Sequence, residues 1–243
     1  MRLVTVSHER GQQLSAISRE GIVDVLKGAQ VFIFDFDGTL VDSNPIKRRA
    51  FALCFAEFPE QRGEVLEYCW GHHHTPRGDK FRYVYEEILK RPFTADVARS
   101  LRQRFEEATT QQIVAAPEIP GAEAFVRSVS RRGRTAVLSS TPQETLEHLL
   151  AARGWRGLFW RVRGAPVEKA AWLKTAIEEQ AGTAEAVVFF GDTVEDAQAA
   201  QAAGCAFLGV GGEPALAKMA RVVENFSALP IAVISGHPSR HDT

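Results

Sequence analysis

Two carboxylates, Asp35 and Asp37, stand at the end of an apolar run that begins at Val31. Such a run predicts a β-strand buried on both faces, as at the centre of a parallel sheet. Because side chains alternate along a strand, both acids share one face, where they repel each other and where an unpaired buried carboxylate is costly. A divalent cation that prefers oxygen ligands, such as Mg²⁺, would relieve both problems. Gly38 then lets the chain turn at the open end of the strand, where such sheets bind ligands.

A second acidic stretch, residues 191–196, follows the apolar residues 187–190. Asp192 therefore also stands at the carboxyl end of a predicted strand, which makes it a candidate metal ligand. Thr193 and Asp196 have the spacing of a helix capping box, and that role alone would account for Asp196. The sequence thus predicts two acidic strand ends at one edge of a sheet.

The elements that must position these acids alternate between strand and helix after residue 117. Strands are predicted at 135–140, 158–162, 186–190 and 206–210, with an edge strand at 221–226, and helices at 122–132, 142–153, 167–180 and 193–203. This alternation indicates an α/β fold, a doubly wound (Rossmann-like) parallel sheet. Thr141 to Glu144 has the pattern of a capping box, so we expect Thr141 to cap the helix that follows.

Residues 44–116 carry only helical patterns. Asn44 and Pro45 predict a helix start with Asn44 as its cap, and further helices are predicted over 81–89 and from Thr94 to about 112. Residues 117–121 predict a return hinge. The expected organisation is a catalytic core of residues 1–43 and 117–243 with an inserted helical domain of residues 44–116. At the N-terminus, residues 3–6 and 21–25 predict short strands, with 16–17 as a third, that form a hairpin at the sheet edge.

Composition narrows the class of function. The net charge is −1 over 243 residues, so nothing indicates binding to nucleic acid or to a membrane surface. The three cysteines are widely spaced, which favours a reducing compartment and argues against a disulfide framework. The N-terminus lacks the apolar core of a signal peptide, so we expect a cytoplasmic protein, a monomer or homodimer.

The stretch from Asp35 to Thr39 resembles the first signature of the haloacid dehalogenase superfamily, Asp-x-Asp-Gly-Thr, and the resemblance extends over residues 31 to about 230. Ser139 matches the second signature, at the end of a strand and before a helix N-terminus that suits a phosphate. Lys169 is the best match to the third, although the usual Lys-Pro pair is absent and Lys174 is an alternative. Asp192 matches the fourth.

The resemblance implies a Mg²⁺-dependent phosphatase acting on a small phosphorylated metabolite, such as a sugar phosphate or phosphoglycolate. Asp35 is then the nucleophile that forms an aspartyl-phosphate, and Asp37 is the general acid and base. Mg²⁺ is expected on a carboxylate oxygen of Asp35, the backbone carbonyl of Asp37, and Asp192. The remaining implied roles are phosphoryl binding by Ser139, Lys169, Gly38 and Ser140, and a pairing of Asp196 with Lys169.

The helical insert lies where the C1 cap lies in phosphatases of the phosphoglycolate phosphatase and β-phosphoglucomutase type. Residues 71–81 are the expected specificity loop, in which Arg77 and Lys80 would meet an anionic or polyol substrate. His72, His73 and His74 are interpreted as polar loop residues, because consecutive residues rarely converge on one metal ion. Two other functions stay open: a phosphomutase with the same residues, and a non-catalytic phospholigand-binding protein.

Overall fold

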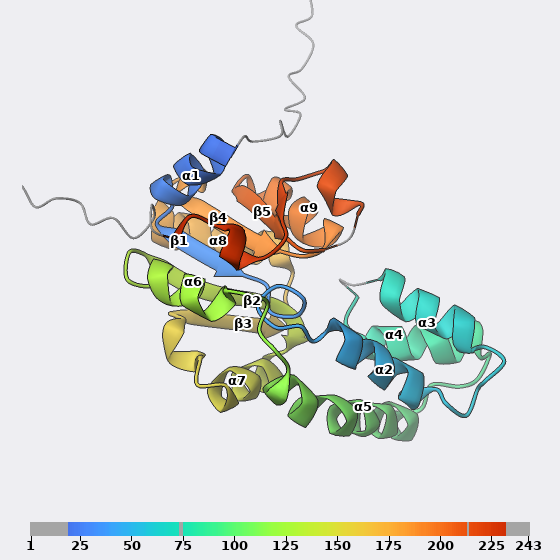
Figure 1. The fold of residues 1–243 in the computed structure, drawn as a ribbon. Helices are drawn as coiled ribbons and strands as arrows, with labels where there is room; N and C mark the ends of the chain where they lie inside the picture. Colours follow the sequence, from blue (N-terminus) through green and yellow to red (C-terminus); the bar gives the residue numbers. More distant parts are fainter. Residues whose placement is uncertain (1–18, 73–74, 213, 232–243) are drawn as a thin grey trace, which may run out of the picture.

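The computed structural model describes residues 19–72, 75–212 and 214–231, which form a six-stranded parallel sheet in the order β3-β2-β1-β4-β5-β6 (Figure 1). The strands are β1 (Val31–Phe34), β2 (Arg134–Pro142), β3 (Arg161–Ala165), β4 (Val187–Gly191), β5 (Ala206–Val210) and β6 (Val222–Val223). The predicted α/β fold class is confirmed. β3 begins later than predicted because residues 156–158 form a 3₁₀ turn.

The strand order reverses beside β1. The chain runs outward from β1 to β2 and β3, then crosses to β4 on the other side of β1, so that Phe34 pairs with Val137 on one side and Phe190 on the other. In open parallel sheets, the carboxyl ends of strands at such a reversal form the ligand-binding crevice. Asp35 follows β1 and Asp192 follows β4, so the topology brings both predicted acidic strand ends to this crevice.

Helices cover both faces of the sheet. α1 (Arg19–Gly28), α6 (Ala122–Val129) and α7 (Gln143–Ala152) pack on the face that carries Phe32 and Phe34. α8 (Lys169–Ala176) and α9 (Val194–Ala203) pack on the face that carries Val31 and Ile33. The alternation predicted for β1 therefore holds, and each face of the strand is fully buried, which is the dominant stabilising term for a central strand.

The predicted strand at residues 21–25 is wrong, because these residues belong to α1. Ile22 and Leu26, one helical turn apart, are both buried against the core, and Val25 packs beside them. The β-branched residues of this segment favoured a strand, but the spacing of its buried side chains is helical. The strands predicted at 3–6 and 16–17 lie outside the described residues.

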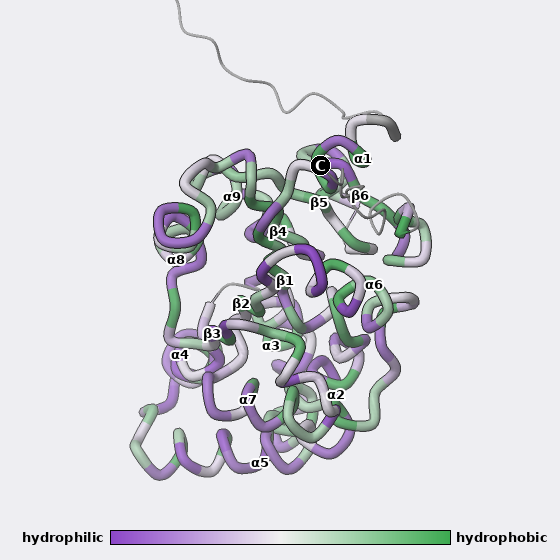
Figure 2. The backbone as a smooth tube through the Cα atoms, turned by 90° about the vertical axis from the view of Figure 1, so that its left-hand side faces the viewer, coloured by the Kyte–Doolittle hydropathy of each residue, from purple (hydrophilic) through white to green (hydrophobic). Residues whose placement is uncertain are grey.

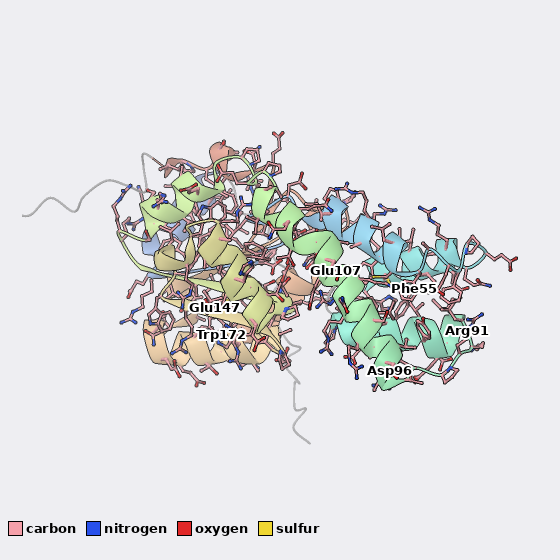
Figure 3. The ribbon with its side chains drawn as sticks, turned by 90° about the horizontal axis from the view of Figure 1, so that it is seen from below. Phe55, Arg91, Asp96, Glu107, Glu147 and Trp172 are labelled. Atoms are coloured by element: carbon pink, nitrogen blue, oxygen red, sulfur yellow. The ribbon has the colours of Figure 1, made fainter. Side chains whose placement is uncertain are left out.

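Residues 44–116, here called the helical insert, form α2 (Asn44–Cys54), α3 (Arg62–Gly71), α4 (Arg77–Tyr83) and α5 (Ala95–Ala115) beside one end of the sheet (Figure 1). They enclose a separate cluster in which the rings of Phe51, Phe81 and Phe105 meet at centroid distances of 4.9 to 6.1 Å. Figure 3 shows Phe55, which packs on Phe81, within the insert, well away from Glu147 and Trp172 on the sheet side.

The helices of the insert agree with the predictions in part. The Thr94 side chain caps α5 by accepting a hydrogen bond from the Val97 N–H, as predicted. Along α5, hydrophilic and hydrophobic stretches alternate (Figure 2), and its buried residues recur at helical spacing. α3 was not predicted, because it buries little more than Val65 and Cys69 and so carries a weak pattern.

Short elements complete the chain. They are the 3₁₀ turns Arg156–Leu158, Ala184–Ala186, Leu216–Lys218 and Phe226–Ala228, and the π-helical turns Val84–Ile88 and Ile177–Ala181 that extend α4 and α8. Within the described ranges, no helix combines the length and the apolar character needed to cross a lipid bilayer.

The two linkers that join the insert to the sheet are hydrogen-bonded to each other. The Asp42 N–H donates to the Pro117 carbonyl at 3.0 Å, and the Ile119 N–H donates to the Leu40 carbonyl at 3.0 Å. Beside them, Arg153 at the end of α7 donates from Nη1 to three carbonyls at the end of α5, at 2.8 to 2.9 Å. These bonds satisfy carbonyls that the last turn of a helix leaves free, and they fix the exit of the insert against the core.

Candidate active site

A cavity of about 460 Å³ lies between the strand ends and the helical insert. Asp35, Ser139 and Asp192 line it from the sheet side, and α9 contributes Glu195. The insert contributes Lys47, Phe51, Trp70, Arg77, Lys80, Phe105, Thr109 and Ile113. The cavity therefore has one wall of titratable and hydroxyl groups and another that is largely aromatic and aliphatic with a few cations.

Asp35 is buried at the end of β1 and contacts one lysine. The Lys169 Nζ lies 3.1 Å from Asp35 Oδ1 and 2.7 Å from Asp196 Oδ1. Burial raises the pKa of Asp35 to about 7 even though Lys169 opposes it, and the nearby carboxylates of Asp196 and Asp37 add to the rise. Lys169 is the first residue of α8, whereas Lys174 is exposed on the same helix, so the structure places only the former at the site.

Asp192 is buried at the end of β4 and receives hydrogen bonds from neutral donors. Thr39 Oγ1 donates to it at 3.2 Å, and Asn44 Nδ2 at 2.9 Å. Burial raises its pKa well above the ordinary value, and the negative charges of Asp35 and Asp196 raise it further. The predicted capping role of Asn44 is wrong, because Ser43 stands at the N-cap position and the Asn44 amide is used to hold Asp192.

Asp37 has a different environment from that of Asp35, although the two residues are nearly adjacent. Lys47 Nζ lies 2.5 Å from Asp37 Oδ2, Thr141 Oγ1 donates to the same oxygen at 2.7 Å, and Ser43 Oγ donates to Oδ1 at 2.6 Å. Burial alone would raise the pKa of Asp37, but Lys47 and the two hydroxyls outweigh it and hold the pKa below its ordinary value.

These partners of Asp37 were not identified from the sequence. Thr141 was expected to cap α7, but that helix begins at Gln143 after Pro142 and has no side-chain cap. Thr141 instead belongs to β2, and its hydroxyl reaches Asp37. Ser139 is buried in the same strand, accepts from the Thr141 N–H at 3.1 Å and lies 3.4 Å from Asp37 Oδ2. Ser140 also lines the cavity, as expected of a phosphoryl-binding residue.

Asp196 has both carboxylate oxygens engaged within the protein. Oδ1 binds Lys169, and Oδ2 accepts from the Thr193 hydroxyl at 2.6 Å and its backbone N–H at 3.3 Å, which completes the predicted capping box. Its predicted pairing with Lys169 is therefore present. This geometry leaves Asp196 as a support for the lysine.

The acids at the strand ends have a donor set that fits a divalent cation. Asp35, Asp192 and Asp196 each place one oxygen within 4.8 Å of the others, and all three are buried. Within the described part of the chain, Asp192 forms no ion pair with a cationic side chain, and one lysine serves both other acids. The raised pKa values of Asp35 and Asp192 indicate that these carboxylates lack nearby positive charge. A hard cation that binds oxygen ligands would supply it.

Gly38 meets a backbone and packing requirement beside these acids. Its φ of +78° is a left-handed conformation that side chains disfavour. A Cβ there would also collide with the side chains of Asp192 and Asn44. Glycine is thus needed for the acidic strand ends to come this close.

Arg77 and Lys80 both line the cavity, from the first turn of α4, but they differ in their partners. Arg77 Nη2 donates to Glu106 at 2.9 Å, and its guanidinium lies 4.6 Å from the centre of the Phe105 ring. Lys80 Nζ donates to the Cys69 carbonyl at 2.8 Å. His72 is exposed and does not line the cavity, while His73 and His74 lie outside the described residues.

The chain belongs to the haloacid dehalogenase-like hydrolase family, whose model matches residues 29–204. The family and the hydrolase class expected from the signatures are thereby confirmed. The chain is 28% identical over 179 residues to the phosphoglycolate phosphatase of Synechococcus elongatus, which covers 72% of this chain and 80% of the relative.

Solved structures share the fold. CbbY from Rhodobacter sphaeroides, determined in complex with phosphate, has a TM-score of 0.66 and 21% identity, over 86% of this chain and 100% of that one. The HAD-hydrolase YfnB from Bacillus subtilis, bound to magnesium, has a TM-score of 0.65 and 14% identity, over 84% of this chain and 98% of that one. At these identities the similarity establishes the architecture alone.

Proposed function

We propose that this protein hydrolyses phosphoric monoesters of small metabolites through an aspartyl-phosphate on Asp35. The observation that carries the proposal is the pair of nearly adjacent acids in one cavity. Asp35 is buried beside Lys169 and among acids that fit a cation, and positive charge at both places favours the ionised form that a nucleophile needs. Asp37 contacts Lys47 and two hydroxyls, which provides a second carboxylate in the same cavity for acid–base catalysis. Membership of the hydrolase family and the similarity to a phosphoglycolate phosphatase support it.

In the first step, a carboxylate oxygen of Asp35 attacks phosphorus while the bond from phosphorus to the leaving oxygen breaks. A proton from Asp37 goes to that oxygen, so the alcohol leaves neutral. Lys169, 3.1 Å from Asp35, orients the nucleophile and offsets phosphoryl charge. Ser139 and Ser140, at the end of β2 near the N-terminus of α7, are placed for the equatorial oxygens.

In the second step, water attacks phosphorus, Asp37 takes its proton, and the bond from phosphorus to Asp35 breaks to release inorganic phosphate. The conformation described here suits this step, because Asp37 accepts hydrogen bonds from Ser43 and Thr141 and pairs with Lys47 as an ionised base would. The proton that Asp37 gains is the one needed for the next first step, so the cycle is balanced.

We infer that the metal is Mg²⁺, held by Asp35, Asp192 and the backbone carbonyl of Asp37. The all-oxygen donor set and the crowded acids support this, as does magnesium in the YfnB structure. When bound, the cation would offset the repulsion between the carboxylates and an incoming phosphoryl group.

We also infer a division into a core of residues 1–43 and 117–243 and a cap of residues 44–116. The separate aromatic cluster of the insert and the paired linkers support it. A cap over the strand ends excludes water and contributes specificity contacts.

A phosphate-release screen with Mg²⁺ over sugar phosphates, phosphoglycolate and p-nitrophenyl phosphate tests the proposal. We expect release of inorganic phosphate from at least one metabolite. Conversion of a sugar phosphate to its isomer without phosphate release would establish a phosphomutase instead. Binding of phosphorylated ligands without any turnover would indicate a non-catalytic protein and contradict the proposal.

A further inference from the structure

Lys80 is a buried cation in the wall of the cavity, and it has no acidic partner within the part of the chain that the structure describes. The residue is only 6% exposed, and its Nζ forms one hydrogen bond, to the Cys69 carbonyl at 2.8 Å. A lysine ammonium has three N–H donors. Among the residues described, none places a carboxylate within ion-pair distance of it. A charge buried without a counter-ion is costly, so the ammonium needs a further partner.

The pKa of Lys80 reflects the cost of burying its charge. Burial and, to a smaller extent, the positive charge of Lys47 lower this pKa to about 8, although Cys69 and Glu195 oppose the shift. Near neutral pH the side chain is still mostly protonated. The cation is therefore present and under-compensated on a surface that also carries Asp35.

Arg77, one turn earlier in α4, does not share this property. Its guanidinium is paired with Glu106 and lies against the Phe105 ring, so its charge is compensated within the insert. Lys47 is likewise compensated, by Asp37. Among the described residues, Lys47 and Arg77 thus have a carboxylate partner and Lys80 has none.

The rest of the cavity wall indicates what kind of molecule reaches Lys80. Phe51 lies under the ammonium, with 5.5 Å from Nζ to the ring centre, and Phe105, Ile113 and Leu149 line the same cavity. A cavity that combines apolar side chains with the acids of the sheet and with Lys80 of the insert suits a small carbon skeleton that carries two polar groups. One of these groups is the phosphoryl group at Asp35, and the other faces the ammonium.

We propose that Lys80 binds a second acidic group of the substrate, so that the natural substrate is a phosphoric monoester carrying a carboxylate or a second phosphate on a short carbon chain. This inference rests on the proposed phosphatase function and narrows its substrate class. The second acid supplies the counter-charge that Lys80 does not receive from the described residues, and it replaces part of the solvation lost on burial.

Matched pairs of esters test the proposal. 2-Phosphoglycolate is compared with 2-hydroxyethyl phosphate, and propane-1,3-diol bisphosphate with 3-hydroxypropyl phosphate, as kcat/KM for phosphate release. We expect the acid-bearing member of one pair to be favoured by at least about tenfold. The pair that shows the preference identifies the second acid as carboxylate or phosphate.

The variant Lys80→Met keeps an unbranched side chain that is one heavy atom shorter, and it removes the charge. We expect this variant to lose most of the preference because kcat/KM for the acid-bearing ester falls. For the hydroxyl esters, kcat/KM should change by less than about threefold. Arg82→Met, which removes an exposed cation of the same helix that pairs with Glu86, is the matched control and should keep the preference.

Two outcomes overturn the inference. One is a wild-type enzyme that hydrolyses both members of each pair equally well, a result that needs no variant to fold. The other is a preference that survives in folded Lys80→Met. Failure of the proposed function is distinguishable from both, because no ester, p-nitrophenyl phosphate included, would then release phosphate.

Discussion

Lys47, in the first turn of α2, forms an ion pair with Asp37 across the boundary between the helical insert and the sheet. Nζ lies 2.5 Å from Asp37 Oδ2 and also donates to Thr141 Oγ1 at 2.9 Å. Asp37 is buried and the Lys47 side chain is 21% exposed, so water screens the pair only weakly. The charge state of Asp37, the proposed acid–base residue, therefore depends on a residue of the insert.

Replacing Lys47 with Met should destabilise the protein. The Asp37 carboxylate would stay buried with hydroxyl partners only, at a cost of about 1–3 kcal/mol. Folding lowers the pKa of Asp37 below its ordinary value of 3.8. The ion pair therefore stabilises the protein at pH values above 3.8, and this stabilisation is lost as the pH falls through the pKa of Asp37 in the folded protein.

Urea unfolding of wild type and Lys47→Met measures this difference. The difference in the free energy of unfolding between the two proteins should be largest near neutral pH and should decrease as the pH is lowered. Arg49→Met, at an exposed position of the same helix, serves as the control and should change stability little. A Lys47→Met deficit that stays constant down to the acid limit of the native state would show that lost packing, and not charge, is responsible.

Asp35→Asn should abolish phosphate release while leaving the fold intact. The amide has the shape of the carboxylate but cannot attack phosphorus. Its thermal stability should equal or exceed that of wild type, because a buried acid with a raised pKa is removed. Phosphate release above about a tenth of the wild-type rate would rule out Asp35 as the nucleophile.

Mg²⁺ should raise the melting temperature and be required for turnover, and Ca²⁺ should inhibit. Calcium takes more ligands at longer distances, which would move the Asp35 oxygen out of line with phosphorus. Differential scanning fluorimetry with and without each ion measures the binding. Asp192→Asn should abolish the stabilisation, and Asp79→Asn, on α4, should retain it. Full activity in excess EDTA would refute the metal assignment.

The preference for acid-bearing substrates should fall as pH rises through about 8, because Lys80 in the free enzyme then loses its proton. Lys47, Cys69 and Glu195 are the charged or titratable groups that shift the pKa of Lys80. The measurement is the pH profile of kcat/KM for a matched pair of esters. In Lys80→Met the ratio of the two esters should not vary with pH in this range. The same pH dependence in that variant would assign the effect to another group.

Gly38→Ala should reduce activity severely. The added methyl group collides with the Asp192 and Asn44 side chains, and the positive φ adds backbone strain. Steady-state kinetics and Mg²⁺-dependent melting should both show the loss, since Asp192 is displaced. Gly63→Ala, in α3 with nothing close to the new methyl, should leave both unchanged or slightly raise stability. Normal Mg²⁺ binding by Gly38→Ala would contradict the packing argument.

The sequence predicted the sheet and the acidic strand ends because these depend on local pattern. The run that ends in Asp35 and the run that ends before Asp192 are each strongly apolar, and parallel strands place their ends together. The partners of Asp37 were missed for the opposite reason. Lys47 and Thr141 come from elements that meet only in the folded chain, and the local signal at Thr141 favoured a cap.

The errors at Asn44 and in α1 have the same origin. Asn44 and Pro45 fit a helix start, yet Ser43 takes the N-cap position and the Asn44 amide donates to Asp192. In α1, the β-branched residues favoured a strand in the prediction. The helix is instead indicated by Ile22 and Leu26, which are one helical turn apart and both buried. In both cases a tertiary contact decided between two local possibilities.

The hydrogen bonds between the linkers at Asp42 and Pro117, and at Leu40 and Ile119, have a consequence for how the chain can be rebuilt. The insert leaves and re-enters the core at one point, so its two ends are already adjacent. A different helical segment joined there would leave the registers of β1 with β2 and β4 unchanged, and a short turn would suffice to close the core without any insert. The insert nevertheless carries Asn44 and Lys47, which contact Asp192 and Asp37, so a segment exchanged at this point must supply equivalent partners for the two acids of the sheet.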